Sequence, residues 1–240
     1  MVQPPKRRIF RIDRIAVGLL LLASLVMAVR GWMLDNPQHD PWAPLELAHP
    51  IGWATGTKLA ALQDDVEECR AVLTRGDVAF EALPPSGEGQ CLRTDRTALG
   101  GSYIAPAAPQ MTCPVATGLQ LWLRHGVEPA AVELLGSPLA RIEHMGTYSC
   151  RRIYGQDSGN WSEHATGNAI DIADFVLEDG RRISLLGDWN GEGEEAEFLR
   201  AVRDSACGLF GTVLSPDYNA AHADHFHLDQ EVRGFGGVCR

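Results

Sequence analysis

Residues 170–186 read IDIADFVLEDGRRISLL, two apolar segments on either side of a short polar turn. Residues 170–176 and 182–186 have the composition of strands, and Glu178-Asp179-Gly180 separates them. Glycine adopts the positive φ that a tight turn requires without steric cost. The stretch therefore predicts a β-hairpin, and with it an antiparallel sheet.

The segments around this hairpin predict a sheet covered by helices. Helical patterns occupy residues 113–126, with Pro114 in the first turn, then 129–135, which stops at Gly136, and 194–210. Further strands are predicted over residues 139–148, 210–214 and 224–229. We therefore expect residues 111–240 to form an α+β domain in which helices pack on a mainly antiparallel sheet.

Residues 1–34 have the composition of an export segment. Five basic residues precede residue 15, and residues 15–29 (IAVGLLLLASLVMAV) carry no charge. Continued to Leu34, this stretch spans about 30 Å as a helix, with Arg30 and Trp32 suited to a membrane interface. A cleaved signal peptide is the alternative, although the pattern of small residues before a cut is poor. We expect an uncleaved transmembrane helix in the inner membrane, with residues 1–14 in the cytoplasm and the rest in the periplasm.

Residues 35–110 are expected to form a linker and an accessory helical region. Residues 35–56 contain four prolines and no helical period, which predicts an extended linker. Apolar residues at spacings of three and four follow Thr57 up to Leu73, which predicts one amphipathic helix over residues 57–73. Residues 84–101 are rich in Gly and Pro and are expected to be irregular.

The formal net charge of −10 is unevenly distributed. Residues 1–34 carry +5, which leaves −15 on residues 35–240. Binding to nucleic acid requires a basic surface. We therefore expect no nucleic-acid partner for the exported part of the chain.

The sequence contains six cysteines, an even number that suits an exported protein with three disulfides. Fifteen pairings are possible, and the pairing that closes modest loops joins Cys69 to Cys91, Cys113 to Cys150 and Cys207 to Cys239. A zinc site built from cysteines is the alternative, but the sequence has no Cys-x-x-Cys. Disulfides are therefore expected.

The stretch SEHATGNAID, residues 162–171, places a histidine seven residues before an aspartate. Gly167 lets the chain turn back between them, and the β-branched residues that follow predict a strand. The imidazole of His164 can then face the carboxylate of Asp171. These are two of the residue types that bind a catalytic zinc.

The stretch DHFH, residues 224–227, supplies further imidazole. Side chains alternate along a strand, so His225 and His227 share one face while Phe226 points to the other, into the core. One histidine can complete a three-ligand metal site and the other is left nearby as a hydrogen-bond donor. His222 is either a capping residue, a donor to this site or a solvated loop residue.

Together the pattern Ser162-x-His164-x-x-Gly167-x-Ala169-x-Asp171 and Asp224-His225-x-His227 resembles the zinc D-alanyl-D-alanine peptidase superfamily, which includes carboxypeptidases and murein endopeptidases. The five fixed positions of the first motif would match by chance on the order of one time in ten thousand. The runs Tyr148-Ser149-Cys150-Arg151 and Ser215-Pro216-Asp217-Tyr218-Asn219 resemble the bacterial extensin-like C-terminal domain proteins, over roughly residues 45–240.

The resemblance implies that His164, Asp171 and His227 bind Zn²⁺. It implies that Asp224 is the general base, where the dipeptidases have the longer Glu, and that His225 stabilises the oxyanion. Arg151 would hold the carbonyl or carboxylate of the substrate. Ser162 is expected to form hydrogen bonds near the metal and not to act as a nucleophile.

The expected function is that of a membrane-anchored zinc peptidase that acts on D-amino-acid-containing peptides of peptidoglycan, of the DD-carboxypeptidase or endopeptidase type. The alternative is a metal-containing, non-catalytic module that binds the cell wall. A third hypothesis is an amidase that acts on another amide of the cell envelope.

Overall fold

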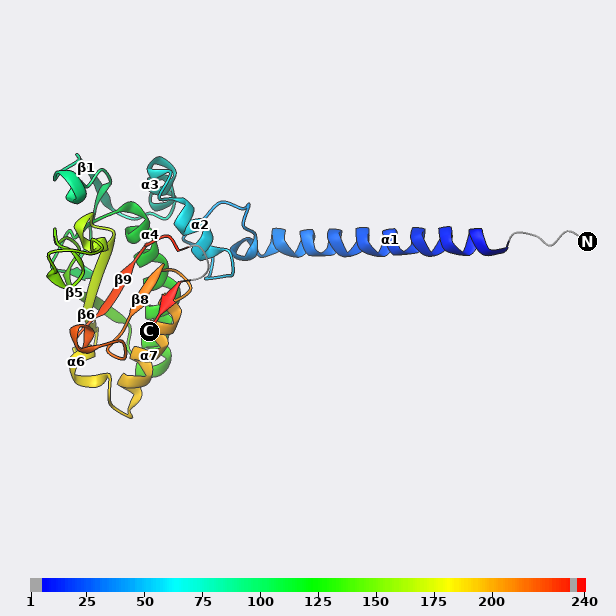
Figure 1. Ribbon diagram of the computed structural model, residues 1–240. Coiled ribbons are helices and arrows are strands. Elements are labelled where there is room, and N and C mark those ends of the chain that lie inside the picture. The colour runs from blue at the N-terminus through cyan, green and yellow to red at the C-terminus, as the bar shows by residue number, and fades with distance from the viewer. Residues whose placement is uncertain (1–5, 234–236) are drawn as a thin grey trace, which may run out of the picture.

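The computed structural model describes residues 6–233 and 237–240. Figure 1 shows a body of helices and strands from which the long helix α1 projects. The α-helices are α1 (Lys6–Asp35), α2 (Thr55–Ala61), α3 (Val66–Arg75), α4 (Cys113–Trp122), α5 (Glu128–Leu135), α6 (Leu185–Asp188) and α7 (Glu194–Ala206), and a π-helical turn, Leu123–Val127, joins α4 to α5. The strands are β1 (Phe80–Leu83), β2 (Arg96–Leu99), β3 (Ile104–Ala105), β4 (Gln110–Met111), β5 (Leu139–Gly146), β6 (Ala169–Leu177), β7 (Arg182–Ser184), β8 (Thr212–Leu214), β9 (Phe226–Asp229) and β10 (Val238–Cys239).

The main sheet has the strand order β10-β8-β9-β6-β5-β3, and β7 pairs with β6 as the predicted hairpin. Its pairs are antiparallel except β10 with β8 and β3 with β5, which are parallel. A smaller antiparallel sheet contains β1, β2 and β4. The expected α+β class with a mainly antiparallel sheet is confirmed.

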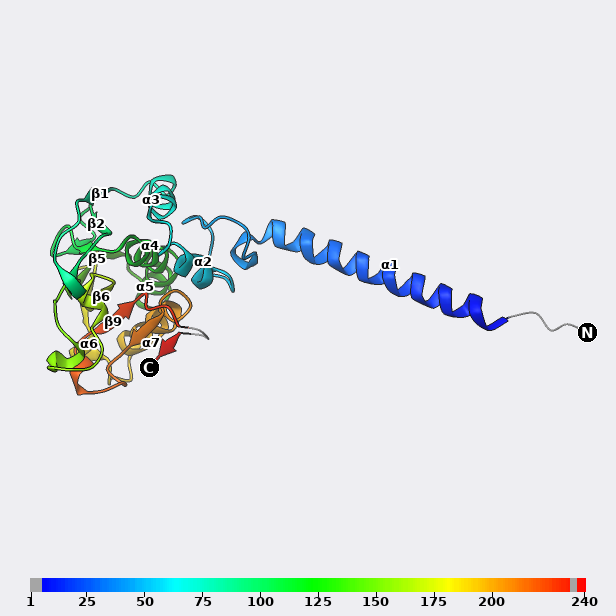
Figure 2. The same ribbon diagram turned by 45° about the horizontal axis from the view of Figure 1, so that its top comes forward.

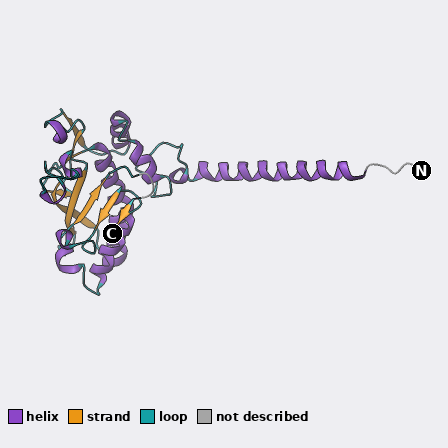
Figure 3. Ribbon diagram, in the orientation of Figure 1, coloured by secondary structure: helices purple, strands orange, loops and turns teal. Residues whose placement is uncertain are grey.

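Helices α4, α5 and α7 lie together on one side of the main sheet (Figures 2 and 3). The ring of Phe175 on β6 lies 5.8 Å from Trp122 of α4 and 5.1 Å from Phe198 of α7, measured between centroids in edge contacts. All three rings are fully buried, as is Phe226 on β9. Aromatic packing of this kind dominates core energetics, so one face of β6 and β9 is committed to the core.

A β-bulge interrupts β6 in the middle. The pairing of β5 with β6 skips Ala173, and the core-facing positions shift from Ile170 and Ile172 to Phe175 and Leu177. A bulge of this kind redirects side chains and is common next to functional sites. Before the bulge, Ile170 and Ile172 face the core, so Asp171 between them points away from it.

The predicted helix over residues 57–73 is wrong, because the chain forms α2 and α3 with a break at residues 62–65. The carboxylate of Asp65 accepts a hydrogen bond from the Glu68 amide at 2.9 Å and caps α3. An N-cap aspartate has non-helical backbone angles, so it starts a new helix. Periodicity alone did not separate the two helices.

The predicted extended linker over residues 35–56 is also wrong. The side chains of Leu45 and Leu47 are buried in the core, and the Leu47 carbonyl lies 2.9 Å from Nε2 of His125. Gly76 leaves room for Leu47, whose Cδ1 would lie 2.4 Å from any Cβ at that position. The segment follows the surface of the body and contributes to its core.

The division of the chain at residue 110 stays a prediction, and contacts cross it. Strand β3, before the boundary, pairs with β5 after it. Leu73 and Leu99 belong to the same buried cluster as Leu119 and Phe226.

The disulfide prediction is right for one bond and wrong for two. Cysteine pairs are Cys69–Cys113, Cys91–Cys150 and Cys207–Cys239, across 44, 59 and 32 residues. Helix α3 packs on α4 and brings Cys69 to the start of α4. Tertiary packing, and not loop length, decides the first two partners.

Among the described residues, one helix is long and apolar enough to cross a membrane by length and composition. Its apolar stretch, Asp13–Asp35, has a mean hydropathy of 2.0, and none of it is buried against the rest of the described chain. Figure 1 shows it extending away from the rest of the chain.

Candidate metal centre

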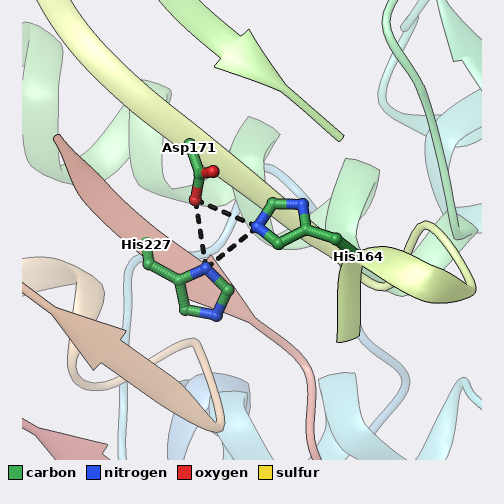
Figure 4. A group of neighbouring side chains, drawn as sticks. All are labelled: His164, Asp171 and His227. Carbon is green, nitrogen blue, oxygen red and sulfur yellow. Dashed lines mark hydrogen bonds and ion pairs between the residues drawn. The ribbon is translucent and has the colours of Figure 1, made fainter. Parts of the chain in front are cut away.

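The strand pairing places Asp171 and His227 side by side. Asp171 on β6 lies directly opposite His227 on β9. Side chains at opposed positions of an antiparallel pair project to the same face of the sheet. Because Phe226 and Leu228 are fully buried on the core side, Asp171 and His227 face away from the core (Figure 4).

A short 3-10 turn, Glu163–Ala165, brings His164 to the same point. The Ser162 hydroxyl caps this turn and accepts a hydrogen bond from the His164 amide at 3.3 Å. Gly167 has φ +75°, a conformation that favours glycine, and its carbonyl accepts from the Thr112 amide at 2.9 Å. The glycine therefore provides the reversal between the turn and β6, and Ser162 has a hydrogen-bonding role.

Three ligand atoms form a nearly equilateral triangle. His164 Nε2 lies 3.1 Å from Asp171 Oδ1 and 3.1 Å from His227 Nδ1, and the last two atoms are 3.0 Å apart. A tetrahedral zinc with bonds of about 2.0–2.1 Å keeps its ligand atoms about 3.3–3.4 Å apart. The separations in this cluster are shorter by a few tenths of an ångström, so the donor set fits one small divalent cation with little movement.

A cation at the centre of the triangle would contact all three ligand atoms, which no single N–H can do. A single N–H on an edge of the triangle points along that edge and leaves the other edges without a donor. The two nitrogen atoms cannot both present lone pairs at 3.1 Å without repulsion. A positive ion at the centre interacts favourably with all three atoms at once.

The electrostatics of the cluster favour positive charge. Burial raises the pKa of the Asp171 carboxyl, but hydrogen bonds from His164 and His227 outweigh burial and hold that pKa well below its usual range. Burial lowers the pKa of His227, yet its hydrogen bonds to Asp171 and Asp229 raise that pKa to about 9. Without a metal, a proton on His227 supplies the charge that the two carboxylates require.

Asp229 orients His227. Its Oδ2 lies 2.9 Å from His227 Nε2, and its side chain is almost fully buried. When Nε2–H donates to this carboxylate, Nδ1 carries the lone pair that faces the triangle. A carboxylate behind a metal-binding histidine is a common arrangement that fixes the ring and increases its basicity.

The cluster lies in a cleft of about 620 Å³. The described lining includes Arg151, Tyr154, Trp161, His222 and His225 in addition to the three cluster residues. The side chain of His164 is 5% exposed and that of Asp171 is 17% exposed. The cluster is therefore shielded but open to a ligand on the cleft side.

His225 faces the cluster, and Asp224 contacts the side of the His225 ring that points away from the cluster. His225 Nε2 lies 3.7 Å from Asp171 Oδ1, while its Nδ1 lies 2.8 Å from Asp224 Oδ1. Asp224 is 46% exposed and is not among the described residues that line the cleft. The structure thus brings His225 to the cluster directly and Asp224 only through His225.

Arg151 lies on the wall of the cleft with an exposed side chain. Among the described residues, nothing forms a hydrogen bond or ion pair with its guanidinium. The neighbouring Arg152 is engaged instead, over the ring of Trp161 at 4.7 Å. Arg151 is therefore free to bind an anionic or carbonyl group.

The sequence analysis gave no role to Asp229 and did not choose among three roles for His222. Asp229 lies two positions after His227 on the same strand face, and this period-two spacing is a signal that could have identified it. His222 Nδ1 lies 2.8 Å from Asn219 Oδ1. Burial, together with His225 and His227, lowers the pKa of His222 to about 4, so its ring is neutral at pH 7.

These features define an α+β protein with a His/Asp/His cluster in an open cleft, a site suited to a divalent metal. The chain belongs to the family described as extensin-like protein C-terminus, whose family model matches residues 67–240, well over half of the sequence. The matched segment contains every member of the cluster and all three disulfides. No solved structure matches the chain.

Proposed function

We propose that this protein is a membrane-anchored, exported zinc-dependent peptidase that cleaves D-amino-acid-containing peptides of the cell wall. One observation carries the proposal: His164, Asp171 and His227 present three ligand atoms within 3.0–3.1 Å of one another in an open cleft. The similarity of the two sequence motifs to zinc DD-peptidases supplies the reaction class. DD-carboxypeptidase and endopeptidase action are both included.

His164, Asp171 and His227 would hold the metal. A divalent cation in this position supplies Lewis acidity toward a carbonyl oxygen and lowers the pKa of water. Asp229 keeps the imidazole of His227 oriented, as its 2.9 Å contact with Nε2 suggests. The chain itself then has to position the peptide and move a proton.

Proton transfer is the role we assign to the pair of Asp224 and His225. Asp224 accepts from His225 Nδ1 and so directs Nε2 into the cleft. An imidazole oriented by a carboxylate takes a proton from an attacking water and returns it to a leaving amine. Asp224 therefore retains a part in the predicted base function through the histidine, and His225, predicted from the sequence to stabilise the oxyanion, is here given the proton-transfer role instead.

Arg151 is the proposed substrate anchor. Its exposed guanidinium on the cleft wall suits the carboxylate or carbonyl of a peptide. Tyr154 and Trp161 line the same wall and offer apolar surface to short side chains such as that of D-alanine. A small, anionic peptide terminus fits this combination of groups.

The location is proposed from two features. Helix α1 is long and apolar enough for an anchor, and a signal sequence passes the same test. Three disulfides are typical of an oxidising compartment outside the cytoplasm. An anchored body outside the cytoplasmic membrane would be next to its cell-wall substrate.

The test uses the full chain, purified in detergent and loaded with zinc, and muropeptides with intact D-Ala-D-Ala termini and crosslinks. Release of D-alanine or of uncrosslinked products, followed by mass spectrometry, is the expected result. His164→Ala should abolish it, and His144→Ala is the matched control because His144 contacts Pro106 O outside the cleft. A zinc-loaded, folded protein that leaves every muropeptide intact contradicts the proposal.

A second candidate is a metal-containing module that binds the cell wall without turnover. The observation that favours it is the exposed position of Asp224 outside the described cleft lining. In that case, Asp224→Asn and His225→Ala would leave both binding to peptidoglycan sacculi and the cellular phenotype unchanged. Loss of the phenotype in either variant, with binding retained, excludes this candidate.

A further inference from the structure

Side chains connect helix α1 directly to the body. Asn36 alone separates the end of α1 from the 3-10 turn Pro37–His39. Arg30 on α1 donates to Asp40 Oδ2 at 2.8 Å, and Asp40 also accepts from the Trp42 amide at 3.0 Å. The side chain of Asp40 is 4% exposed, so this ion pair forms against the folded chain and not on a loose loop.

Aromatic rings strengthen the same connection. Trp32 of α1 stacks on His39 with ring centroids 5.2 Å apart. The ring of Trp53 lies 4.6 Å from His39 and 5.7 Å from Trp32. The Trp53 amide donates to His39 Nδ1 at 3.1 Å. The three rings thereby join α1, the 3-10 turn and the turn that precedes α2.

The segment of residues 36–54, which we call the junction segment, continues into the core. Lys58 on α2 donates to the Pro37 carbonyl at 2.8 Å, and the Ala54 amide donates to the Gln38 carbonyl at 3.2 Å. Gly52 is required by close packing, since a Cβ there would lie 2.5 Å from the Gln38 carbonyl oxygen. Leu59 on α2 is fully buried. Helix α1 is therefore attached to the body without a flexible tether.

The junction segment also exposes large aromatic surface. Outside α1, the two most exposed aromatic side chains among the described residues are Trp42, at 81%, and Trp53, at 78%. Large exposed apolar groups on one short segment indicate a binding surface. Tryptophan in particular is enriched at the level of lipid headgroups, where its ring meets apolar chains and its N–H meets water.

The position of Arg30 sets the depth of this surface. Arg30 lies five residues before the end of the apolar stretch at Asp35, which is about 7.5 Å along a helix. An arginine at that depth extends its side chain toward the headgroups. Its partner Asp40 belongs to the junction segment, so that segment must lie within a few ångströms of the hydrocarbon edge.

We propose that the junction segment binds the membrane surface. It lies in the phospholipid headgroup layer of the membrane that α1 spans, with Trp42 and Trp53 inserted into that layer. Continuity with α1 identifies the occupant, because a body joined to the helix through Arg30 and Trp32 has no room to stand away from the bilayer. The inference rests on the anchor part of the proposed function and is independent of the metal chemistry.

The test measures tryptophan fluorescence of the full chain in phosphatidylcholine vesicles whose acyl chains carry bromine, a short-range quencher, near the headgroup or near the bilayer centre. Three of the six tryptophans, Trp32, Trp42 and Trp53, belong to α1 and the junction segment. In the Trp42→Phe/Trp53→Phe variant, the emission quenched by shallow bromine should fall to roughly a third, since two of three interfacial rings are removed. Deep bromine should quench less than shallow bromine.

Trp161→Phe is the matched control, because Trp161 lies in the cleft wall and its loss should leave the quenched emission as in the wild type. The single variant Trp42→Phe removes an 81% exposed ring and so does not depend on core packing. Equal quenching of wild type and double variant overturns the proposal, as does an intact mass showing that the membrane-derived protein lacks residues 1–34. Metal content, measured on the same samples, should be unchanged in all these variants and separates this proposal from that of the metal centre.

Discussion

The candidate metal centre, formed by His164, Asp171 and His227, and the junction segment are held by different kinds of interaction. At the candidate metal centre, the backbone pairing of β6 with β9 places Asp171 opposite His227. The side chains supply the ligand atoms but do not hold the strands together. In the junction segment, side chains make the connection themselves, through Arg30 with Asp40 and through the Trp32 and His39 rings. Substitution at the centre should therefore change chemistry and leave the fold, whereas substitution at the junction should change attachment and leave the chemistry.

The largest expected effect on zinc binding comes from His227→Ala. The variant loses one of three ligand atoms, so zinc affinity should fall by more than about 100-fold, above the range typical for a lost outer hydrogen bond. Isothermal titration calorimetry with zinc measures the change. His144→Ala should bind zinc like the wild type. Equal affinities of His227→Ala and wild type would remove His227 from the metal centre.

His225→Ala should lower kcat by about 10²- to 10⁴-fold, the range for loss of a general acid–base group. Zinc content should not change, because His225 Nε2 is 3.7 Å from Asp171 Oδ1 and lies outside the triangle. Asp224→Asn should have a smaller effect in the same direction and shift the pH profile of kcat. A loss of zinc in His225→Ala would mean that His225 is itself a ligand.

Asp229→Asn tests the residue that orients His227. The expected result is a 10- to 100-fold decrease in zinc affinity, the typical effect of losing such a hydrogen-bond partner (about 1–3 kcal/mol). Far-UV circular dichroism should show an intact fold. Unchanged affinity would indicate that the 2.9 Å contact between Asp229 and His227 has no effect on the metal.

Zinc affinity should also depend on pH in a defined direction. In the metal-free protein the pKa of His227 is raised to about 9, so at pH 7 the ring is protonated and zinc must displace about one proton. Apparent affinity should fall about tenfold for each pH unit below 9 and level off above it. Calorimetry in buffers of different ionisation enthalpy measures the released proton, and a release near zero at pH 7 contradicts the protonated state.

The smallest effect is expected at the junction. Arg30→Gln breaks an ion pair whose arginine is 56% exposed, while the buried Asp40 keeps its hydrogen bond from the Trp42 amide, so the loss of stability should be small. The thermal midpoint of the body should fall by no more than about 4 °C, with zinc content unchanged. Differential scanning calorimetry in detergent gives the midpoint. A large fall would mean that the body depends on α1 for its folding.

The sequence predicted that His164, Asp171 and His227 converge because they are close along the chain or on paired strands. His164, Gly167 and Asp171 lie within one turn-and-strand unit, where local geometry decides what can meet. His227 required only the alternation of side chains along β9. The same alternation places Asp229 on the strand face of His227. The hydrogen bond between the two side chains, however, depends on the three-dimensional structure.

The junction segment and two disulfides could not be predicted in this way. Cys69 meets Cys113 because α3 packs on α4, a contact between segments far apart in sequence. Prolines in residues 35–56 indicate irregular backbone, but not that Leu47 is buried beside Gly76. Irregular local structure and dense packing are compatible, and only the tertiary arrangement distinguishes a folded segment from a linker.

The most direct test of the metal centre is the metal content of the full chain purified without added chelator, measured by inductively coupled plasma mass spectrometry beside His227→Ala. We predict that the site formed by His164, Asp171 and His227 holds close to one zinc per wild-type chain and almost none in the variant, with both proteins folded. A folded wild-type protein that holds no divalent metal, and binds none on titration with zinc, would contradict it.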